Sequence, residues 1–217
     1  MGRDAGKLTE VSVELADSRT ACCDVSDAAD VARLAVELAG ETVSLLVNNA
    51  GIGGPVAPLH SIDAVEWDQV FAANVRSVFL MCKAFLPPML DRGAGDIINM
   101  ASLTGKRPLI RRTPYAASKM AVLGLTRTLA FEAGPRGVSV NSLSLGPVRG
   151  ARMRRNFALK ARASGRTEAE AERDFVSRAA LNRLVEEEDV GRTVVAMTQM
   201  PGLCGADIDL SAGMVAP

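Results

Sequence analysis

Short apolar runs alternate with longer helical patterns along the whole chain, and this alternation is the strongest constraint on its fold. The run at residues 43–47 reads VSLLV, which is apolar on both faces and is typical of a buried strand. Strands that alternate with helices predict an α/β fold, a Rossmann-like doubly wound parallel sheet with helices on both faces. The predicted strands are 20–23, 43–47, 96–100, 138–143 and 207–210, and the predicted helices are 7–16, 27–39 (capped by Ser26), 64–90 (ending near Pro87 and Pro88), 115–133, 152–178 and 187–200.

Length and composition exclude several classes of protein. The 217 residues predict one domain, 1–217. The 25 basic and 25 acidic residues cancel, and aromatic residues make up only 4%, so we expect no nucleic-acid partner. The four cysteines form no CxxC pair and His60 is distant from all of them, so we expect no metal site. The sequence shows no signal peptide and no continuous apolar run of about 20 residues, which predicts a cytoplasmic protein without a membrane partner.

Four polar marks occur in a fixed order and point to chemistry. Asn48-Asn49-Ala50-Gly51 follows the strand 43–47, Asn74 lies within a helix, Ser102 follows a strand, and Tyr115 precedes Lys119 by four residues on one helix face. Ligands of α/β sheets bind at the carboxyl ends of strands. An ammonium beside a phenol favours the phenolate, which suits Tyr115 for general acid/base work, while a hydroxyl at Ser102 can hold a substrate oxygen.

These marks together resemble the short-chain dehydrogenase/reductase family over nearly the whole chain. The resemblance implies an NAD(P)-dependent oxidoreductase that moves hydride between nicotinamide and a secondary alcohol or ketone. It implies that Tyr115 exchanges the proton, that Lys119 assists it and binds the nicotinamide ribose, that Ser102 orients the carbonyl, and that Asn74 supports a proton relay. It also implies a homodimer or homotetramer paired through helices 64–90 and 115–133.

The resemblance further implies a cofactor site of NADP or NAD. A basic residue at the position of Arg3 often pairs with the 2′-phosphate, so NADP is slightly favoured. The cofactor-binding residues would be Arg3, Asp24, Val25, Asn48, Asn49, Ala50, Gly51, Tyr115, Lys119, Gly146 and Val148.

One feature departs from the family pattern. The glycine-rich TGxxxGxG loop that would hold the pyrophosphate is absent from the sequence. We therefore expect a chain that starts about 35 residues late, a length comparable to one βαβ unit, and lacks the first strand, the first helix and most of the second strand. The strand 43–47 would then have an unpaired edge or take strand 20–23 as its neighbour. This leaves two alternatives to the active enzyme, a non-catalytic remnant that pairs with an intact subunit, and an epimerase or dehydratase.

The stretch 149–166 carries seven basic residues and no acidic one. One interpretation is a basic lid for an anionic substrate, which the flanking residues Lys106, Arg107, Arg111 and Arg112 support. The other is a solvated helix with local ion pairs, which we favour.

Overall fold

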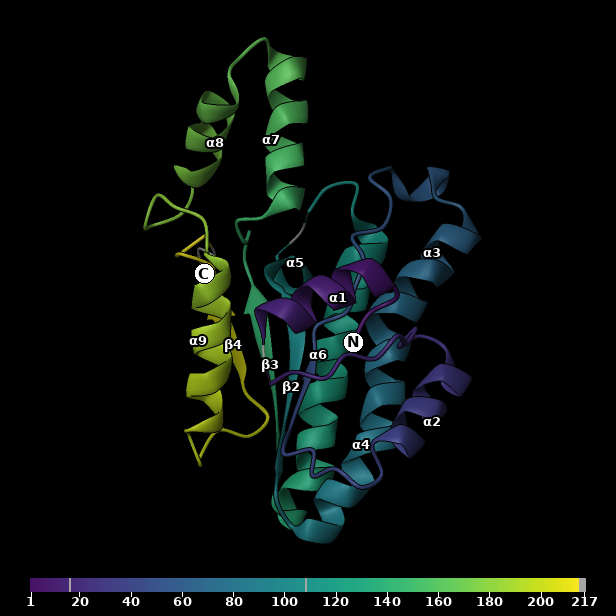
Figure 1. The fold of residues 1–217 in the computed structure, drawn as a ribbon. Helices are drawn as coiled ribbons and strands as arrows, with labels where there is room; N and C mark the ends of the chain where they lie inside the picture. The colour runs from purple at the N-terminus through teal and green to yellow at the C-terminus, as the bar shows by residue number, and fades with distance from the viewer. Residues whose placement is uncertain (16, 108, 215–217) are drawn as a thin grey trace.

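The sheet is the central layer of the fold. The computed structural model describes residues 1–15, 17–107 and 109–214, and places four parallel strands in the order β1-β2-β3-β4 (Figure 1). The strands are β1 (Leu45–Asn48), β2 (Gly95–Ser102), β3 (Val138–Leu145) and β4 (Asp207–Leu210).

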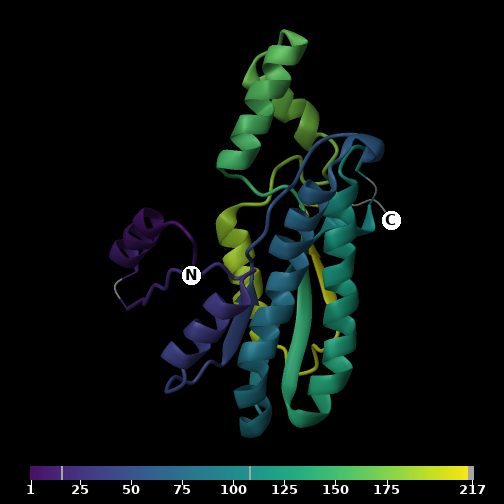
Figure 2. The same cartoon turned by 90° about the vertical axis from the view of Figure 1, so that its right-hand side faces the viewer.

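Helices cover both faces of this sheet, because the side chains of a strand alternate between its two faces. Ile97 of β2 packs on the side of α4 and α6, while its neighbour Ile98 packs with Met197 of α9 on the other side (Figures 1 and 2). The predicted doubly wound α/β fold is thus confirmed. The helices are α1 (Ala5–Glu14), α2 (Ala28–Glu37), α3 (Ala64–Phe71), α4 (Ser77–Arg92), α5 (Leu103–Lys106), α6 (Thr113–Ala133), α7 (Ala151–Ser164), α8 (Glu168–Val176) and α9 (Glu187–Thr198), with 3-10 turns at Leu59–Ser61 and Gly134–Arg136 and a π-helical turn at Ala72–Arg76.

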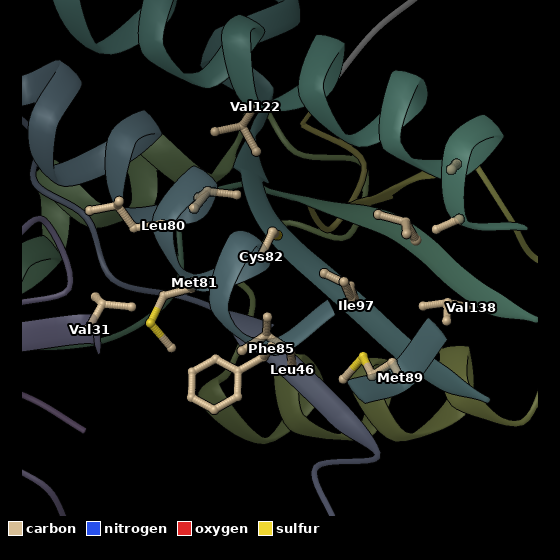
Figure 3. Close-up of a cluster of buried hydrophobic side chains, with 14 of the residues drawn as sticks. Val31, Leu46, Leu80, Met81, Cys82, Phe85, Met89, Ile97, Val122 and Val138 are labelled. Atoms are coloured by element: carbon tan, nitrogen blue, oxygen red, sulfur yellow. The ribbon is translucent and has the colours of Figure 1, made fainter. Parts of the chain in front are cut away.

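The larger hydrophobic core lies between the sheet and α2, α4 and α6. Figure 3 shows Leu46 of β1 and Ile97 of β2 facing Phe85 and Met89 of α4, with Val122 reaching in from α6. Each of these side chains is less than a tenth exposed, and burying one contributes about 1.5–3 kcal/mol. This core fixes α4 and α6 against the sheet and so sets the position of every side chain on the buried face of α6.

The stretch Ala64–Arg92 is long and apolar enough to cross a membrane by length and composition. It is a core helix here, because Met81, Phe85 and Met89 are buried against the sheet. The predicted end near Pro87 and Pro88 is wrong, since α4 continues through both prolines to Arg92. Both prolines are exposed, so the carbonyls that they leave without a helical donor lie on the solvent side, and the next turn is anchored by Met89.

The segment before β1 differs from its prediction in two respects. Residues 20–23 form a single parallel bridge, between Gly2 and Cys22, and in the described part of the chain β1 pairs with β2 alone. Helix α2 is capped by Asp27, whose carboxylate accepts from the Ala29 and Asp30 N–H groups, and not by Ser26. Ser26 instead donates its hydroxyl to Asp24.

The charged stretch predicted as one helix at 152–178 is two helices. Gly165 takes a left-handed φ of 65° and ends α7, and Thr167 then caps α8 by accepting from the Glu170 N–H. The pair α7–α8 rises beyond the end of the sheet where β2 and β3 finish (Figures 1 and 2). It therefore stands over the edge at which the candidate site lies.

Candidate active site

Helix α6 presents Tyr115 and Lys119 one turn apart on one face. The Lys119 Nζ lies 5.9 Å from the centre of the Tyr115 ring and donates to the carbonyl of Met100 at 2.8 Å. Tyr115 is half-buried, whereas Lys119 is only 6% exposed. The β2 carbonyl thus holds the ammonium in place beside the phenol.

The ammonium of Lys119 sits in an environment that disfavours its charge. Burial, and secondly the positive charge of Arg152, lower the pKa of Lys119 from 10.5 to about 8. At neutral pH the group is still mostly protonated. A cation in such a poorly solvated position acts on its neighbours more strongly than one in water.

Ser102 ends β2 and caps the short helix α5. Its hydroxyl accepts from the Thr104 N–H at 3.2 Å and donates to the Leu145 carbonyl of β3 at 3.4 Å. Helix α5 packs directly on α6, since a Cβ added to Gly105 would lie 3.1 Å from the carbonyl carbon of Lys119. Ser102 therefore shares the sheet edge with the Tyr115–Lys119 pair, and within residues 17–107 and 109–214 no hydrogen bond joins it to either.

Asn74 lies in the π-helical turn and is fully buried. Its carboxamide accepts from the Ile52 N–H at 2.7 Å and donates to the Ile52 carbonyl and to the Ser118 hydroxyl, both at 3.0 Å. A Cβ at Gly51 would lie 2.9 Å from the Asn74 Oδ1 and 3.7 Å from the Lys119 Nζ. The hydrogen bonds of Asn74 thus join the loop after β1 to α6, and that loop has no space for a side chain at residue 51.

The four residues after β1 divide into two groups. Asn48 points into the core, where its Nδ2 donates to Asn99 at 2.8 Å, and Asn99 in turn donates to Thr126 of α6 at 2.9 Å. Asn49 and Ala50 are exposed at the sheet edge, as is the glycine that follows them. Of this motif, the Asn48 side chain is structural, and the exposed residues are free to face a ligand.

The residues expected at the adenine end also come together. Arg3 lies 3.5 Å from the carboxylate of Asp24. Hydrogen bonds from Ser26, with a further contribution from Arg3, hold the pKa of Asp24 below its usual value. A cavity of about 330 Å³ opens at the carboxyl end of β1, and its lining residues are Met1, Val25, Val47, Asn48, Asn49, Ala50, Ser77 and Met81.

Gly146 and Val148 follow β3 at the same edge. The Gly146 N–H donates to the Leu210 carbonyl at 2.8 Å, and a Cβ there would lie 2.8 Å from the Cα of Ser211, so only glycine fits. Val148 bridges to Val185 and packs near α5. Both residues therefore lie beside the strand end that carries Ser102.

Two residues near Tyr115 were not assigned a role from the sequence. Ser118 has no motif signal, although its hydroxyl links Asn74 to the Tyr115 carbonyl. Arg112 was noted only as a charge near the site, whereas its guanidinium carbon lies 5.3 Å from the centre of the Tyr115 ring. A basic residue three positions before the tyrosine is the only sequence signal for that contact.

The edge around Lys119 could accept the nicotinamide half of a dinucleotide. Lys119 supplies a cation, Tyr115 a hydroxyl, and Gly51 an exposed backbone without a side chain, which together suit a ribose and the ring attached to it. The pyrophosphate end lacks the glycine-rich loop, which the sequence does not contain. In the described ranges no group of three or more His, Cys, Asp or Glu side chains is arranged to hold a metal ion.

Comparison with known proteins agrees with this geometry. The sequence pattern of the family described as short chain dehydrogenase matches residues 1–161. D-threitol dehydrogenase of Mycolicibacterium smegmatis is 42% identical over 124 residues, which cover 56% of this chain and 47% of that protein. The chain thus spans about half the length of this relative in the match.

A second relative is covered more fully. 2-(S)-hydroxypropyl-CoM dehydrogenase 3 of Xanthobacter autotrophicus is 33% identical over 198 residues, which cover 89% of this chain and 75% of that protein. Among solved structures, a ribose-5-phosphate isomerase from Brucella melitensis 16M superposes with a TM-score of 0.86 and 31% identity, covering 98% of this chain and 79% of that one.

Proposed function

The chain belongs to the short-chain dehydrogenase family, and we propose that it transfers hydride between NAD(P) and a secondary alcohol or ketone. The observation that carries this proposal is the buried Lys119 ammonium 5.9 Å from the Tyr115 ring centre at the carboxyl edge of a parallel sheet. Two relatives named as dehydrogenases support the same type of reaction.

In this proposal Tyr115 is the general acid/base. Its hydroxyl gives a proton to the substrate oxygen during reduction and takes it back during oxidation. Lys119 stabilises the phenolate that remains, and the Met100 carbonyl keeps the ammonium in position. Ser102 donates a hydrogen bond to the substrate oxygen, for which its hydroxyl exchanges the long 3.4 Å bond to Leu145. Asn74 acts by positioning the loop after β1, and its relay role would need its bond to Ser118 to open.

The residues that would hold the cofactor are those at the sheet edge. The nicotinamide supplies or accepts the hydride when it is bound. Lys119 would bind the nicotinamide ribose, the turn 49–51 would line it, and Gly146 and Val148 would lie at the carboxamide. Asp24 and Val25 would contact the adenine. We favour NADP over NAD, because the Arg3 side chain is 72% exposed and its guanidinium can pair with a 2′-phosphate.

We propose further that the chain works as one domain and as a homodimer or homotetramer through α4 and α6. A groove of about 460 Å³ runs between these helices and is lined mainly by apolar side chains such as Leu86 and Leu125. Phe79 is 51% exposed beside it and Phe131 is 85% exposed on α6. A second copy of the same pair would cover these rings. The cytoplasm is the proposed location.

The test follows NADPH and NADH with purified chain. Binding of each cofactor is measured by its fluorescence, and turnover by the loss of NAD(P)H absorbance with a panel of ketones. Tyr115→Phe should lower kcat about 100- to 10,000-fold and weaken cofactor binding far less, because the proton donor is lost while Lys119 and the turn 49–51 remain. Absence of both cofactor binding and ketone turnover would contradict the proposal and favour the non-catalytic partner subunit.

A redox-neutral reaction on the same residues is the second candidate. The Brucella neighbour is named an isomerase, which favours this alternative. An epimerase or dehydratase would convert its substrate without net change in NAD(P)H. Product formation at constant NAD(P)H absorbance would therefore identify it.

A further inference from the structure

The space around the Tyr115 ring carries positive charge from two side chains. Arg112 approaches the ring at 5.3 Å and Lys119 at 5.9 Å. Burial lowers the pKa of both groups, with a smaller contribution from the positive charge of Arg152. No carboxylate forms an ion pair with Arg112 or Lys119 in the part of the chain that the structure describes.

Arg112 is held in a way that leaves it short of partners. Its Nη2 packs against Gly53, where an added Cβ would lie 2.7 Å away, so the loop after β1 fixes the guanidinium. Its Nε is buried and has no hydrogen-bond partner among the described residues. The backbone of the site therefore offers Nε no partner, while Arg112 as a whole is only partly buried, so the end of its guanidinium can contact a bound group.

Other basic residues of this region, in contrast, are paired with carboxylates. Arg149 is bound by two carboxylates, Glu172 at 2.8 Å and Glu186 at 3.1 Å, and Arg166 is paired with Asp174. The local ion pairs expected for a solvated helix are therefore present at both ends of the basic stretch.

We propose that the substrate carries an anionic group close to its reacting carbon, and that the Arg112 guanidinium binds this group. This inference rests on the proposed function and names its substrate class. A guanidinium presents a planar fork that matches a carboxylate, sulfonate or phosphate in two hydrogen bonds. Its position against the Tyr115 ring places the anion at the proton-transfer end of the site, opposite the Arg3–Asp24 end proposed for the adenine.

Two matched pairs of ketones test this assignment. The first is acetoacetate and its methyl ester, and the second is glycerone phosphate and glycerone, so that a carboxylate and a phosphate are each compared with a neutral partner. We expect the anionic member of at least one pair to have the higher kcat/KM, mainly through a lower KM. Arg112→Gln should reduce the anionic-to-neutral ratio of kcat/KM about 10- to 100-fold, because a charge-assisted hydrogen bond is lost.

Arg154→Gln is the matched control, since it removes an exposed arginine from the first turn of α7. It should leave the ratio of each pair unchanged. A ratio that is insensitive to Arg112→Gln, or that falls equally with Arg154→Gln, overturns the inference while the oxidoreductase assignment stands.

A binding measurement decides the point without turnover. Malonate and inorganic phosphate are titrated into the protein at constant ionic strength and followed by calorimetry. We expect binding of at least one of them that Arg112→Gln abolishes and Arg154→Gln preserves. If no ketone is reduced, the proposed function fails, and the titration still decides the anion site. If neither anion binds to the unaltered protein, the inference is wrong.

Discussion

Replacing Lys119 with methionine should make the protein more stable at neutral pH while removing its activity. Lys119 is buried, and its pKa falls from 10.5 to about 8. Its ammonium therefore opposes folding wherever it stays protonated. Methionine has a similar length and volume and carries no charge to bury.

The size of the effect follows from two opposing contributions. A tenfold change in proton affinity corresponds to about 1.4 kcal/mol, so a fall from 10.5 to about 8 costs about 3 kcal/mol at pH 7. Methionine loses the bond to the Met100 carbonyl, and an unsatisfied buried carbonyl costs about 1–2 kcal/mol. The net gain is about 1–2 kcal/mol, which raises the Tm of a chain of this size by roughly 2–8 °C.

The pH dependence gives the decisive measurement. Between pH 8 and 10.5 the unfolded lysine binds more protons than the folded one, so the stability of the unaltered protein rises with pH across this window. The variant lacks this rise and should be the less stable protein at pH 10.5. Calorimetric Tm values at pH 7 and pH 10.5 test this, with the exposed Lys160→Met as control. A Tm difference that keeps its sign and size at both pH values would refute the reasoning.

Two further predictions concern packing and assembly. Asn74→Ala should lower the free energy of unfolding by about 3–5 kcal/mol, because both backbone groups of Ile52 and the hydroxyl of Ser118 lose a hydrogen-bond partner. Denaturant unfolding measures this loss. A loss below about 1 kcal/mol would mean that water replaces these bonds. Phe131→Asp on α6 should shift the protein toward monomers in light scattering, because the new charge enters the proposed interface. Val195→Asp on α9 is the control and should leave the mass unchanged, because α9 lies outside that interface. An unchanged mass for both variants would exclude α6 from the interface.

The alternation of strands and helices, and the strand ends at which the candidate residues lie, were accessible from the sequence because both follow from the hydrophobic pattern. Tyr115 and Lys119 share a face because residues four apart in a helix always do, whatever packs around them. The strand end that carries Ser102 follows equally from an apolar run that stops.

Element boundaries were less accessible, because they depend on competition between local groups. Ser26 and Asp27 are both good caps, and the sequence does not show that Asp24 takes the hydroxyl of the first. Pro87 predicts a helix end, and the burial of Met89 two residues later overrides it. Tertiary contacts determine where such a helix begins or ends, and a short segment of sequence does not reveal these contacts.

Side-chain direction was the least accessible property. Asn48 and Asn49 are identical neighbours, and one points into the core while the other faces the solvent. Arg112 carries no pattern that distinguishes it from Arg111, although only the former lies against the Tyr115 ring. In both cases the direction of the side chain depends on which side of the backbone is packed against the rest of the protein.

The row of hydrogen bonds from Asn48 through Asn99 to Thr126 also acts as a test of correct assembly. Asn48 and Asn99 lie directly opposite one another in the pairing of β1 with β2. A slip of one residue would set a carboxamide against Ile98 or Met100 and leave its donors unmet inside the protein. Apolar side chains tolerate such a shift far better. The polar row therefore raises the free energy of a misaligned sheet and disfavours that sheet during folding.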